Sequence, residues 1–454
     1  MLLKNEGGAL PLAKGEVLNL FGKGVHVFRY CAVGAGKINP RYYKSFLEAA
    51  EEEGVSVNQE LVDFYACGED VIPPMDMLKR ARALSDTALM FITRPAGENR
   101  DLTSDPGAFD LSWQEENLLA ELGRIFGRVI VVLNVGAPIG IRFLHRPEVS
   151  AVLYNGYGGM LAGEALLGVL MGRVNPSGRL VDTWAAEYGK IPSSMNFYDA
   201  AGGKPSFGAD DGDVWIDTCY EEGLYVGYRY FESFPEAEPL RLPFGFGLSY
   251  TEFETSNVLV SFQEGVLRLE ADIRNAGSRA GREVWQVYLG HPGTLQESPV
   301  KTLTQFTKTG LLQPGQQEHV QVEVPFAWMG IYDERRSAWV LEKGEYQVFA
   351  GGDARSCKLC YEFQVEKEVV MQQGKERMRP LEAVEEMTSL PGGKAWPTGE
   401  KSQVKGEGVG LSLEREENYP VPLPEIKENE ELWKLVQGMD AWTKARLCIC
   451  EGHG

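Results

Sequence analysis

The fold is decided by the stretch ALMFITRPAGENRDLTSDPGAFDLSWQEENLLAELGRIFGRVIVVLNVG, residues 88–136. It begins with residues 88–92, a short apolar run typical of a strand, and passes into a polar loop. Ser112 and Glu115 then form a capping-box pattern, which predicts the start of a helix. Residues 129–133 have the composition of a strand that is buried on both faces. The unit therefore places its most charged loop at the carboxyl end of a strand, where open α/β sheets bind ligands.

The same alternation of strand and helix signals runs through residues 1–200. Further strands are predicted at residues 17–21 and 151–154, and helices at residues 40–53, 75–84 and 162–171. Regular alternation of this kind favours an α/β sandwich, a mainly parallel sheet covered by helices on both faces.

From about residue 254 the apolar residues recur with a period of two. Short strands separated by glycine-containing turns are predicted at residues 258–260, 266–273, 283–289, 320–324 and 345–349. This pattern indicates an antiparallel β-sandwich of immunoglobulin or fibronectin type. The predicted fold class is therefore α/β plus all-β.

Composition changes again after the predicted sandwich. We expect an α/β domain over residues 1–253 and a β-sandwich over 254–366. Residues 367–429 are charged and rich in Gly, Pro, Lys and Glu, which predicts a linker. Residues 430–454 contain one amphipathic helical pattern, and a piece of this size is too small to fold alone.

The overall charge limits the possible partners. The chain of 454 residues has 45 basic and 65 acidic side chains and a formal net charge of −20, and it has no strong basic cluster. We therefore expect neither nucleic acid nor an anionic membrane as a partner. No apolar run approaches the ~20 residues that span a bilayer. Residues 1–5 lack the pattern of a signal peptide, so the sequence predicts a cytoplasmic location.

No metal site or cofactor is predicted. The seven cysteines are an odd number spread over the chain, which suits reduced thiols. Cys357 and Cys360 have a spacing used by metal sites, but no pair of histidines accompanies them. The glycines of residues 34–36 and 156–159 complete neither a dinucleotide-binding nor a P-loop pattern, and we interpret them as tight turns.

The candidate catalytic residue is Glu98, in the charged loop over residues 93–111. It lies between Arg94 and Arg100, with Asp101 nearby, and a loop carboxylate of this kind can act as a general acid and base. The alternative is a surface loop held by salt bridges. Glycoside hydrolysis needs a second carboxylate, and the spacing of the sequence does not identify one.

Several ordered motifs resemble glycoside hydrolase family 3. The loop Arg94-x-x-Gly97-Glu98-x-x-Asp101 is similar to the acid/base loop of that family. Similar segments of the same family domain are found at residues 2–12, 178–184, 225–231 and 243–250, and residues 299–301 and 311–315 resemble its fibronectin type III-like domain.

The resemblance implies a retaining β-glucosidase, with β-xylosidase or α-L-arabinofuranosidase specificity as alternatives. Glu98 would protonate the glycosidic oxygen and later deprotonate the attacking water, while Arg94 and Asp101 would orient the loop. The expected substrate is an oligosaccharide or another β-glycoside, and no cofactor is implied. Asn99 stands where some relatives have glycine.

The family's nucleophile is an aspartate of a separate (β/α)8 barrel, usually followed by Trp, and this sequence has no Asp-Trp pair. Some members have the order α/β domain, fibronectin-like domain, barrel. Residues 432–454 resemble the first helix leading into such a barrel, so the chain is expected to stop where the barrel begins. We expect this chain to be inactive alone and to need the barrel as a partner. Apolar surface left exposed at the docking face would favour homo-oligomers.

A second hypothesis is a non-catalytic carbohydrate-binding or interaction fragment, with the sandwich as its contact surface. Trp285, Trp328 and Trp339 are the candidate contact residues. Large aromatic side chains are more often buried, so we expect these three in the core.

Overall fold

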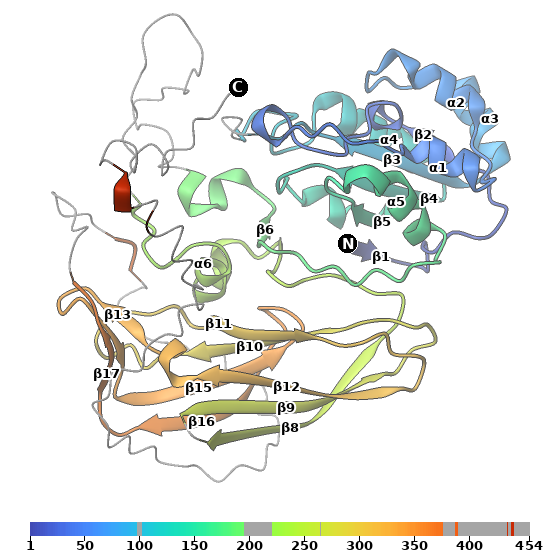
Figure 1. Cartoon of the computed structure of the whole chain (residues 1–454). Coiled ribbons are helices and arrows are strands. Elements are labelled where there is room, and N and C mark those ends of the chain that lie inside the picture. Colours follow the sequence, from blue (N-terminus) through green and yellow to red (C-terminus); the bar gives the residue numbers. More distant parts are fainter. Residues whose placement is uncertain are drawn as a thin grey trace, which may run out of the picture.

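The computed structural model describes residues 1–97, 102–194, 220–263, 265–375, 386–388, 434 and 437–439. Figure 1 shows an α/β unit, coloured blue to green, beside a β-sandwich coloured yellow to orange. The predicted fold class is confirmed: a mainly parallel sheet with helices is followed by antiparallel sheets.

The α/β unit is built on a five-stranded sheet with the strand order β1-β5-β4-β3-β2. Its strands are β1 (Leu2–Asn5), β2 (Asn19–Phe21), β3 (Thr87–Thr93), β4 (Arg128–Asn134) and β5 (Val149–Tyr154). Strands β2 to β5 are parallel, whereas β1 is an antiparallel edge strand that pairs with β5. All seven residues of β3 are buried, as expected for a central strand covered on both faces.

Helices cover the sheet, and most were predicted. They are α1 (Phe46–Glu52), α2 (Gln59–Phe64), α3 (Met75–Leu84), α4 (Trp113–Ile125) and α5 (Ala162–Leu170). The capping box predicted at Ser112 and Glu115 is present and begins α4. The predicted helix at residues 40–53 begins later than expected, because Ser45 and Glu48 form a capping box that sets its first turn. Sequence analysis did not identify α2.

Short elements complete the unit: the strands β6 (Trp184–Ala185) and β7 (Arg241–Leu242) and the helix α6 (Tyr228–Ser233). The unit also contains short 3-10 helices at Lys23–Val25, Gly34–Gly36, Tyr65–Cys67, Arg142–His145, Gly159–Leu161, Tyr188–Lys190, Pro192–Ser194 and Pro235–Ala237. A further 3-10 helix, Phe326–Trp328, belongs to the sandwich. None of the helices in the described ranges is long and apolar enough to cross a bilayer.

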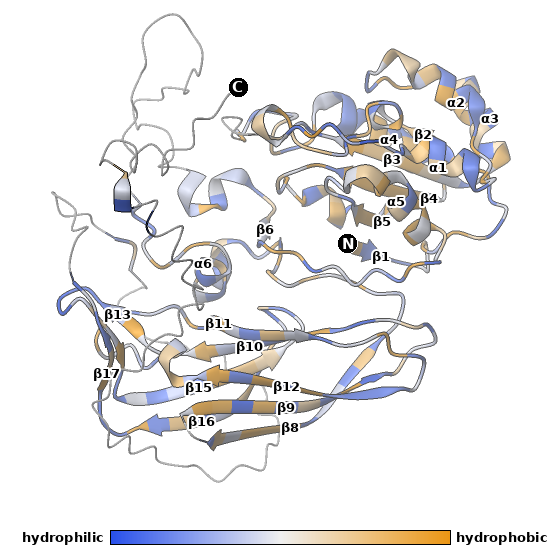
Figure 2. Ribbon diagram, viewed as in Figure 1, coloured by the Kyte–Doolittle hydropathy of each residue, from blue (hydrophilic) through white to orange (hydrophobic). Residues whose placement is uncertain are grey.

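The sandwich packs two antiparallel sheets over a common core, and Figure 2 shows hydrophobic and hydrophilic residues alternating along its strands. One sheet has the order β11-β10-β15-β16 and the other β12-β9-β8. Their bounds are β8 (Phe253–Gln263), β9 (Val266–Asn275), β10 (Val284–Gly290), β11 (Thr302–Lys308), β12 (Gln317–Pro325), β15 (Gly344–Gly351) and β16 (Lys358–Val365). A smaller sheet contains β13 (Ile331–Asp333), β14 (Ala338–Leu341) and β17 (Val369–Gln373) in the order β13-β14-β17.

The tryptophans of the sandwich differ in burial. Trp285 lies in the core and is 2% exposed, as expected. Trp328 and Trp339 are 49% and 44% exposed, so the expectation of a core position is wrong for both. In β14 the neighbours Ala338 and Val340 point inward, and the alternation of the strand turns Trp339 outward.

Strand β17 lies inside the segment that composition assigns to a linker. Its residues Val369 and Met371 are buried, and the strand pairs with β14. The charged residues that flank it hide the short apolar alternation, so the linker prediction is wrong for residues 369–373. Nearly all of the remaining predicted linker, and most of the predicted helix in 430–454, lie outside the described residues.

The α/β unit and the sandwich share a cluster of aromatic side chains. Tyr228 and Phe244 come from the first and pack against Tyr288 and Phe349 of the second. The hydroxyl of Tyr228 also accepts a hydrogen bond of 2.8 Å from the backbone N–H of Leu303. These contacts make the two parts one packed body.

Candidate active site at the carboxyl edge of the parallel sheet

Glu98 and Asp101 lie outside the described residues, but the chain is described on both sides of them. Gly97, the residue before Glu98, forms a parallel bridge with Val33, which follows β2. The backbone N–H of Val33 donates to the carbonyl oxygen of Ala96 over 2.9 Å. A Cβ atom at Gly97 would lie 2.7 Å from the carbonyl oxygen of Val33, so only glycine allows this approach. The start of the loop is therefore fixed at the carboxyl edge of the sheet.

The other side of the loop is fixed as well. The backbone N–H of Phe109 donates to the carbonyl oxygen of Thr103 over 3.2 Å. The ring of Phe109 is buried and makes an edge contact with Tyr188, with 5.6 Å between the ring centroids. Helix α4 begins four residues later, so the loop returns to a rigid element.

Arg94 pairs with helix α4. Its guanidinium binds both carboxylate oxygens of Glu115, and both side chains are almost completely buried. It also donates to the carbonyl oxygen of Thr93 over 3.2 Å. Glu115 thus closes the capping box and neutralises a buried cation at the same time. This bidentate pair joins the end of β3 to the start of α4, on the two sides of the candidate loop.

Asn134, the last residue of β4, is hydrogen-bonded to the segments that follow β2, β3 and β5. Its Oδ1 accepts from the backbone N–H of Arg29 over 2.6 Å, and its Nδ2 donates to the carbonyl oxygens of Arg29 and Gly156 over 2.8 and 2.7 Å. The backbone N–H of Arg94 donates to the carbonyl oxygen of Asn134 over 3.3 Å. Sequence analysis missed this residue, although an asparagine that ends an apolar strand at the carboxyl edge is a usable signal.

Tyr157 closes the site on the side of β5. Its hydroxyl donates to the carbonyl oxygen of Arg94 over 2.6 Å, and burial raises the pKa of its phenol. Its ring lies so close to Gly136 that a Cβ atom there would clash. The glycine after β4 therefore makes room for a tyrosine that holds the backbone just before the candidate loop.

Asp110 is a titratable group at the end of the loop. It lines a hollow of about 200 Å³ together with Trp113 and Arg142. Burial raises the pKa of its carboxyl, the nearby Arg142 opposes that shift, and Glu187 adds to it. Trp113, the first residue of α4, is 72% exposed beside this carboxyl.

Large apolar side chains are exposed along this edge. Because the helices that follow parallel strands begin at the carboxyl edge, the residues before and at those helix starts gather there. Exposed examples are Ile38, Tyr42, Trp113, Met160 and Leu161. These side chains give the carboxyl edge an apolar component.

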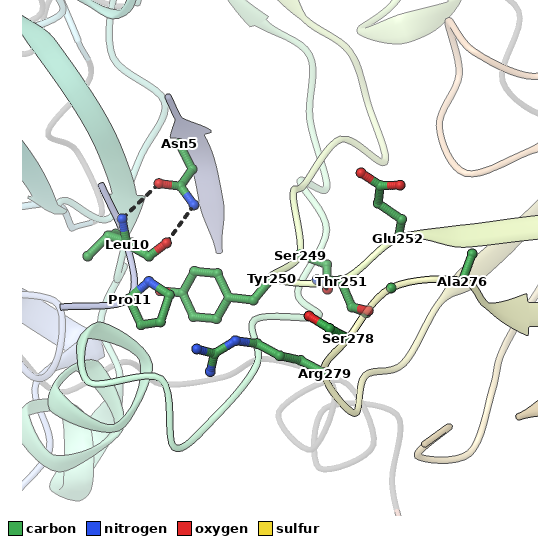
Figure 3. A pocket seen from close by; sticks show the side chains of 11 residues that line it. Asn5, Leu10, Pro11, Ser249, Tyr250, Thr251, Glu252, Ala276, Ser278 and Arg279 are labelled. Atoms are coloured by element: carbon green, nitrogen blue, oxygen red, sulfur yellow. Dashed lines mark hydrogen bonds between the residues drawn. The ribbon is translucent and has the colours of Figure 1, made fainter. Parts of the chain in front are cut away.

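The pocket drawn in Figure 3 lies at the other edge of the sheet. It has a volume of about 660 Å³ and lies between the chain around Asn5 and Pro11 and the start of the sandwich at Tyr250 and Arg279. Asn5 pairs with Ala151 near the start of β5, which places this pocket at the amino-terminal edge of the parallel strands. It is therefore separate from the candidate active site.

Comparison with known families identifies both parts of the chain. Residues 1–228 match the glycosyl hydrolase family 3 C-terminal domain, and residues 283–354 match the fibronectin type III-like domain. A β-glucosidase of Ruminococcus albus is 32% identical over 421 residues, covering 87% of this chain and 43% of the relative. β-Glucosidase A of Butyrivibrio fibrisolvens is 32% identical over 451 residues, covering 86% of this chain and 52% of the relative. The chain thus spans about half the length of the curated relatives it matches.

Comparison with solved structures identifies the same family. β-Glucosidase 3B of Thermotoga neapolitana, determined in complex with α-D-glucose, matches with a TM-score of 0.71 and 34% identity, covering 81% of this chain and 52% of the other. A β-glucosidase of Paenibacillus barengoltzii matches with a TM-score of 0.72 and 29% identity, covering 83% and 43%. Because the family model covers half of the chain and the same fold recurs in these enzymes, this chain belongs to glycoside hydrolase family 3.

Proposed function

We propose that this chain provides the acid/base half of a retaining β-glucosidase, with Glu98 as the general acid and base. The supporting observation is the anchoring of the described residues on both sides of Glu98: Gly97 is bridged to Val33, and the ring of Phe109 packs against Tyr188. Family membership and β-glucosidase relatives support the same reaction class. Arg94 acts as a positioning residue through Glu115, and we keep Asp101 as a second residue that orients the loop.

In the proposed reaction, Glu98 protonates the glycosidic oxygen while a nucleophilic carboxylate attacks the anomeric carbon from the opposite face. The sugar is then held as a covalent glycosyl-enzyme. Glu98, now a carboxylate, takes a proton from water, and that water displaces the enzyme carboxylate with net retention. The two carboxyl groups must be about 5–5.5 Å apart, so the nucleophile has to face the loop from an opposing surface.

We propose that this opposing surface is a (β/α)8 barrel outside residues 1–454, with residues 430–454 as the segment that leads into it and a domain boundary near residue 253. The exposed apolar residues of the carboxyl edge, among them Trp113 and Tyr42, support a docking face there. The substrate would be a terminal β-D-glucoside, bound between the barrel and this edge. β-Xylosidase or α-L-arabinofuranosidase specificity depends on side chains of the barrel.

The first experiment measures hydrolysis with and without a barrel fragment from a permuted relative. The chain alone is expected to be inactive on an aryl β-glucoside, because half a site cannot complete a double displacement. With the barrel present, Glu98→Gln is expected to lower kcat on cellobiose by about 10²–10⁴-fold. On 2,4-dinitrophenyl β-glucoside, whose leaving group needs no proton, kcat/KM should fall much less, whereas kcat should still fall because Glu98 no longer deprotonates the attacking water.

Asp105→Asn is the matched control, because Asp105 is an exposed carboxylate of the same loop. It is expected to leave kcat within about twofold on both substrates, in the range of surface substitutions. Turnover by the chain alone that Glu98→Gln abolishes would overturn the need for a barrel. Equal losses for both variants would overturn the assignment of Glu98.

The exposure of Trp339 supports the second candidate function, a non-catalytic carbohydrate-binding fragment. Sugar binding together with failure of every barrel fragment to restore hydrolysis would favour it.

A further inference from the structure

A second cavity lies where the α/β unit meets the smaller sheet of the sandwich. Its volume is about 630 Å³, within the range of about 300–1,000 Å³ common for small-molecule sites. Residues 220–229, the connection between β10 and β11, and strands β13 and β14 line it, together with residues 386–388. In Figure 1 the labels β13 and α6 mark this region. None of the described residues within 88–136 lines the cavity.

An aromatic pair forms one wall. Tyr332 and Trp339 are directly opposite each other on β13 and β14, and their rings meet edge to face with centroids 5.5 Å apart. The next pair, Ile331 and Val340, is buried. The alternation of the strands therefore keeps one face of the small sheet in the core and turns the aromatic face toward the cavity.

Polar groups form the facing wall. The hydroxyl of Tyr225 donates to Glu297 over 2.6 Å, which fixes this carboxylate at the rim. The hydroxyl oxygen of Ser298 is buried, and among the described residues it has no hydrogen-bond partner. Arg229 and Gln296 also line the cavity and add planar groups that can form paired hydrogen bonds. A buried hydroxyl without a partner is unfavourable unless a ligand satisfies it.

The walls are held in place by contacts between the two parts of the chain. The backbone N–H of Val300 donates to the hydroxyl oxygen of Ser233 over 3.1 Å, and that of Leu303 donates to the hydroxyl oxygen of Tyr228 over 2.8 Å. The N–H of Met387 donates to the carbonyl oxygen of Glu221 over 2.5 Å. The cavity is thus preformed, which lowers the entropy cost of binding.

We propose that this cavity is a carbohydrate-binding site that is distinct from the candidate active site. Its ligand is a β-linked gluco-oligosaccharide. The hydroxyl groups of a β-glucosyl ring are equatorial, so its two faces carry C–H groups that pack on an aromatic ring, while its edge forms hydrogen bonds. Trp339 and Tyr332 provide the aromatic surface, and Glu297, Ser298 and Arg229 provide hydrogen-bonding groups for the ring edge. This site is independent of the chemistry at Glu98.

The test measures binding of cellotriose to the full chain by isothermal titration calorimetry and by saturation-transfer NMR. Trp339→Ala is expected to weaken binding at least tenfold, and Trp339→Phe to retain binding within about threefold because a flat ring remains. Ser298→Ala removes the buried hydroxyl and is expected to weaken binding severalfold. Thermal unfolding of each variant checks that the fold is kept.

Trp328→Ala is the matched control, because Trp328 is equally exposed but does not line the cavity. It is expected to bind as tightly as the parent chain, as is Glu98→Gln. The proposal is overturned if the parent does not bind cellotriose at millimolar concentration, if Trp339→Ala binds like the parent, or if Trp328→Ala loses as much. Loss of binding in Glu98→Gln would place the sugar in the candidate active site instead. That result would overturn this inference and leave the proposed function standing.

Discussion

At the scale of single residues, the buried Arg94–Glu115 pair joins the two sides of the candidate loop. Both charges are removed from water, so each depends on the other. The sequence suggested that Arg94 orients the loop but did not identify its partner. Glu115 already had a role in the capping box, and spacing alone does not reveal that one carboxylate can serve two contacts.

Arg94→Met is therefore expected to cost about 3–5 kcal/mol of unfolding free energy, because it leaves a buried carboxylate without its cation. Adding Glu115→Leu should recover part of this loss, since the double variant has no buried charge. Urea unfolding of the parent, the two single variants and the double variant measures the coupling. Additive losses would show that the pair does not act as a unit.

Asp110 predicts a dependence of stability on pH. Its folded-state pKa is raised by burial, so folding favours the protonated carboxyl. This contribution is complete below the unfolded-state pKa and is lost as pH rises through the folded-state pKa. Asp110→Asn should gain stability relative to the parent as pH rises from 3 to 7, by less than about 1 kcal/mol because the group is partly solvated. Thermal melts at several pH values would contradict this if the difference stayed constant.

At the scale of elements, hydrophobic periodicity predicted the strands and helices that have long, regular patterns. Strands β3 and β4 and helix α3 were found within one or two residues of their predicted bounds, and α4 begins at its predicted cap. The elements that were missed are short or edge elements. Strand β1 has only four residues, too few for a recognisable hydrophobic alternation, and it is stabilised by its antiparallel pairing with β5. For β17, the apolar residues are embedded in charged sequence.

Strand β17 gives a prediction about the segment that composition alone assigns to a linker. Met371 is buried in the core of the sandwich, whereas its neighbour Val370 is exposed. Met371→Ala is expected to cost about 2–5 kcal/mol, the range for large-to-small changes in a core. Val370→Ala is the control and should change the unfolding free energy by less than about 1 kcal/mol. Urea unfolding distinguishes a packed strand from a linker, since in a linker both changes would be silent.

At the scale of the whole molecule, the sequence predicted two folded parts but not how they are joined. The order of the motifs along the chain does not reveal that Tyr228 and Phe244 of the α/β unit pack in one cluster with Tyr288 and Phe349 of the sandwich. The same limit applies to the candidate site, because contacts between segments distant in sequence cannot be predicted from the sequence. The candidate loop was predicted from its own residues and from the family resemblance. Asn134 and Tyr157 were not predicted, because they act through contacts between strands that are distant in sequence.

Tyr228→Ala is expected to cost about 3–5 kcal/mol, as for other large aromatic truncations, and to reduce the cooperativity between the two parts. Tyr228→Phe removes only the hydrogen bond to Leu303 and should cost about 1 kcal/mol. Differential scanning calorimetry would show one transition in the parent and a broadened or split transition in Tyr228→Ala. A single unshifted transition would mean that the shared cluster does not couple the two parts.

The shared aromatic cluster also bears on how genes for such proteins can be rearranged. A recombination event that separated the α/β unit from its sandwich would leave Tyr288 and Phe349 uncovered in one product and Tyr228 in the other. Each product would then expose apolar aromatic surface to water. An event that moves the two parts together leaves the cluster intact, so we expect the two parts to be exchanged between genes as one unit.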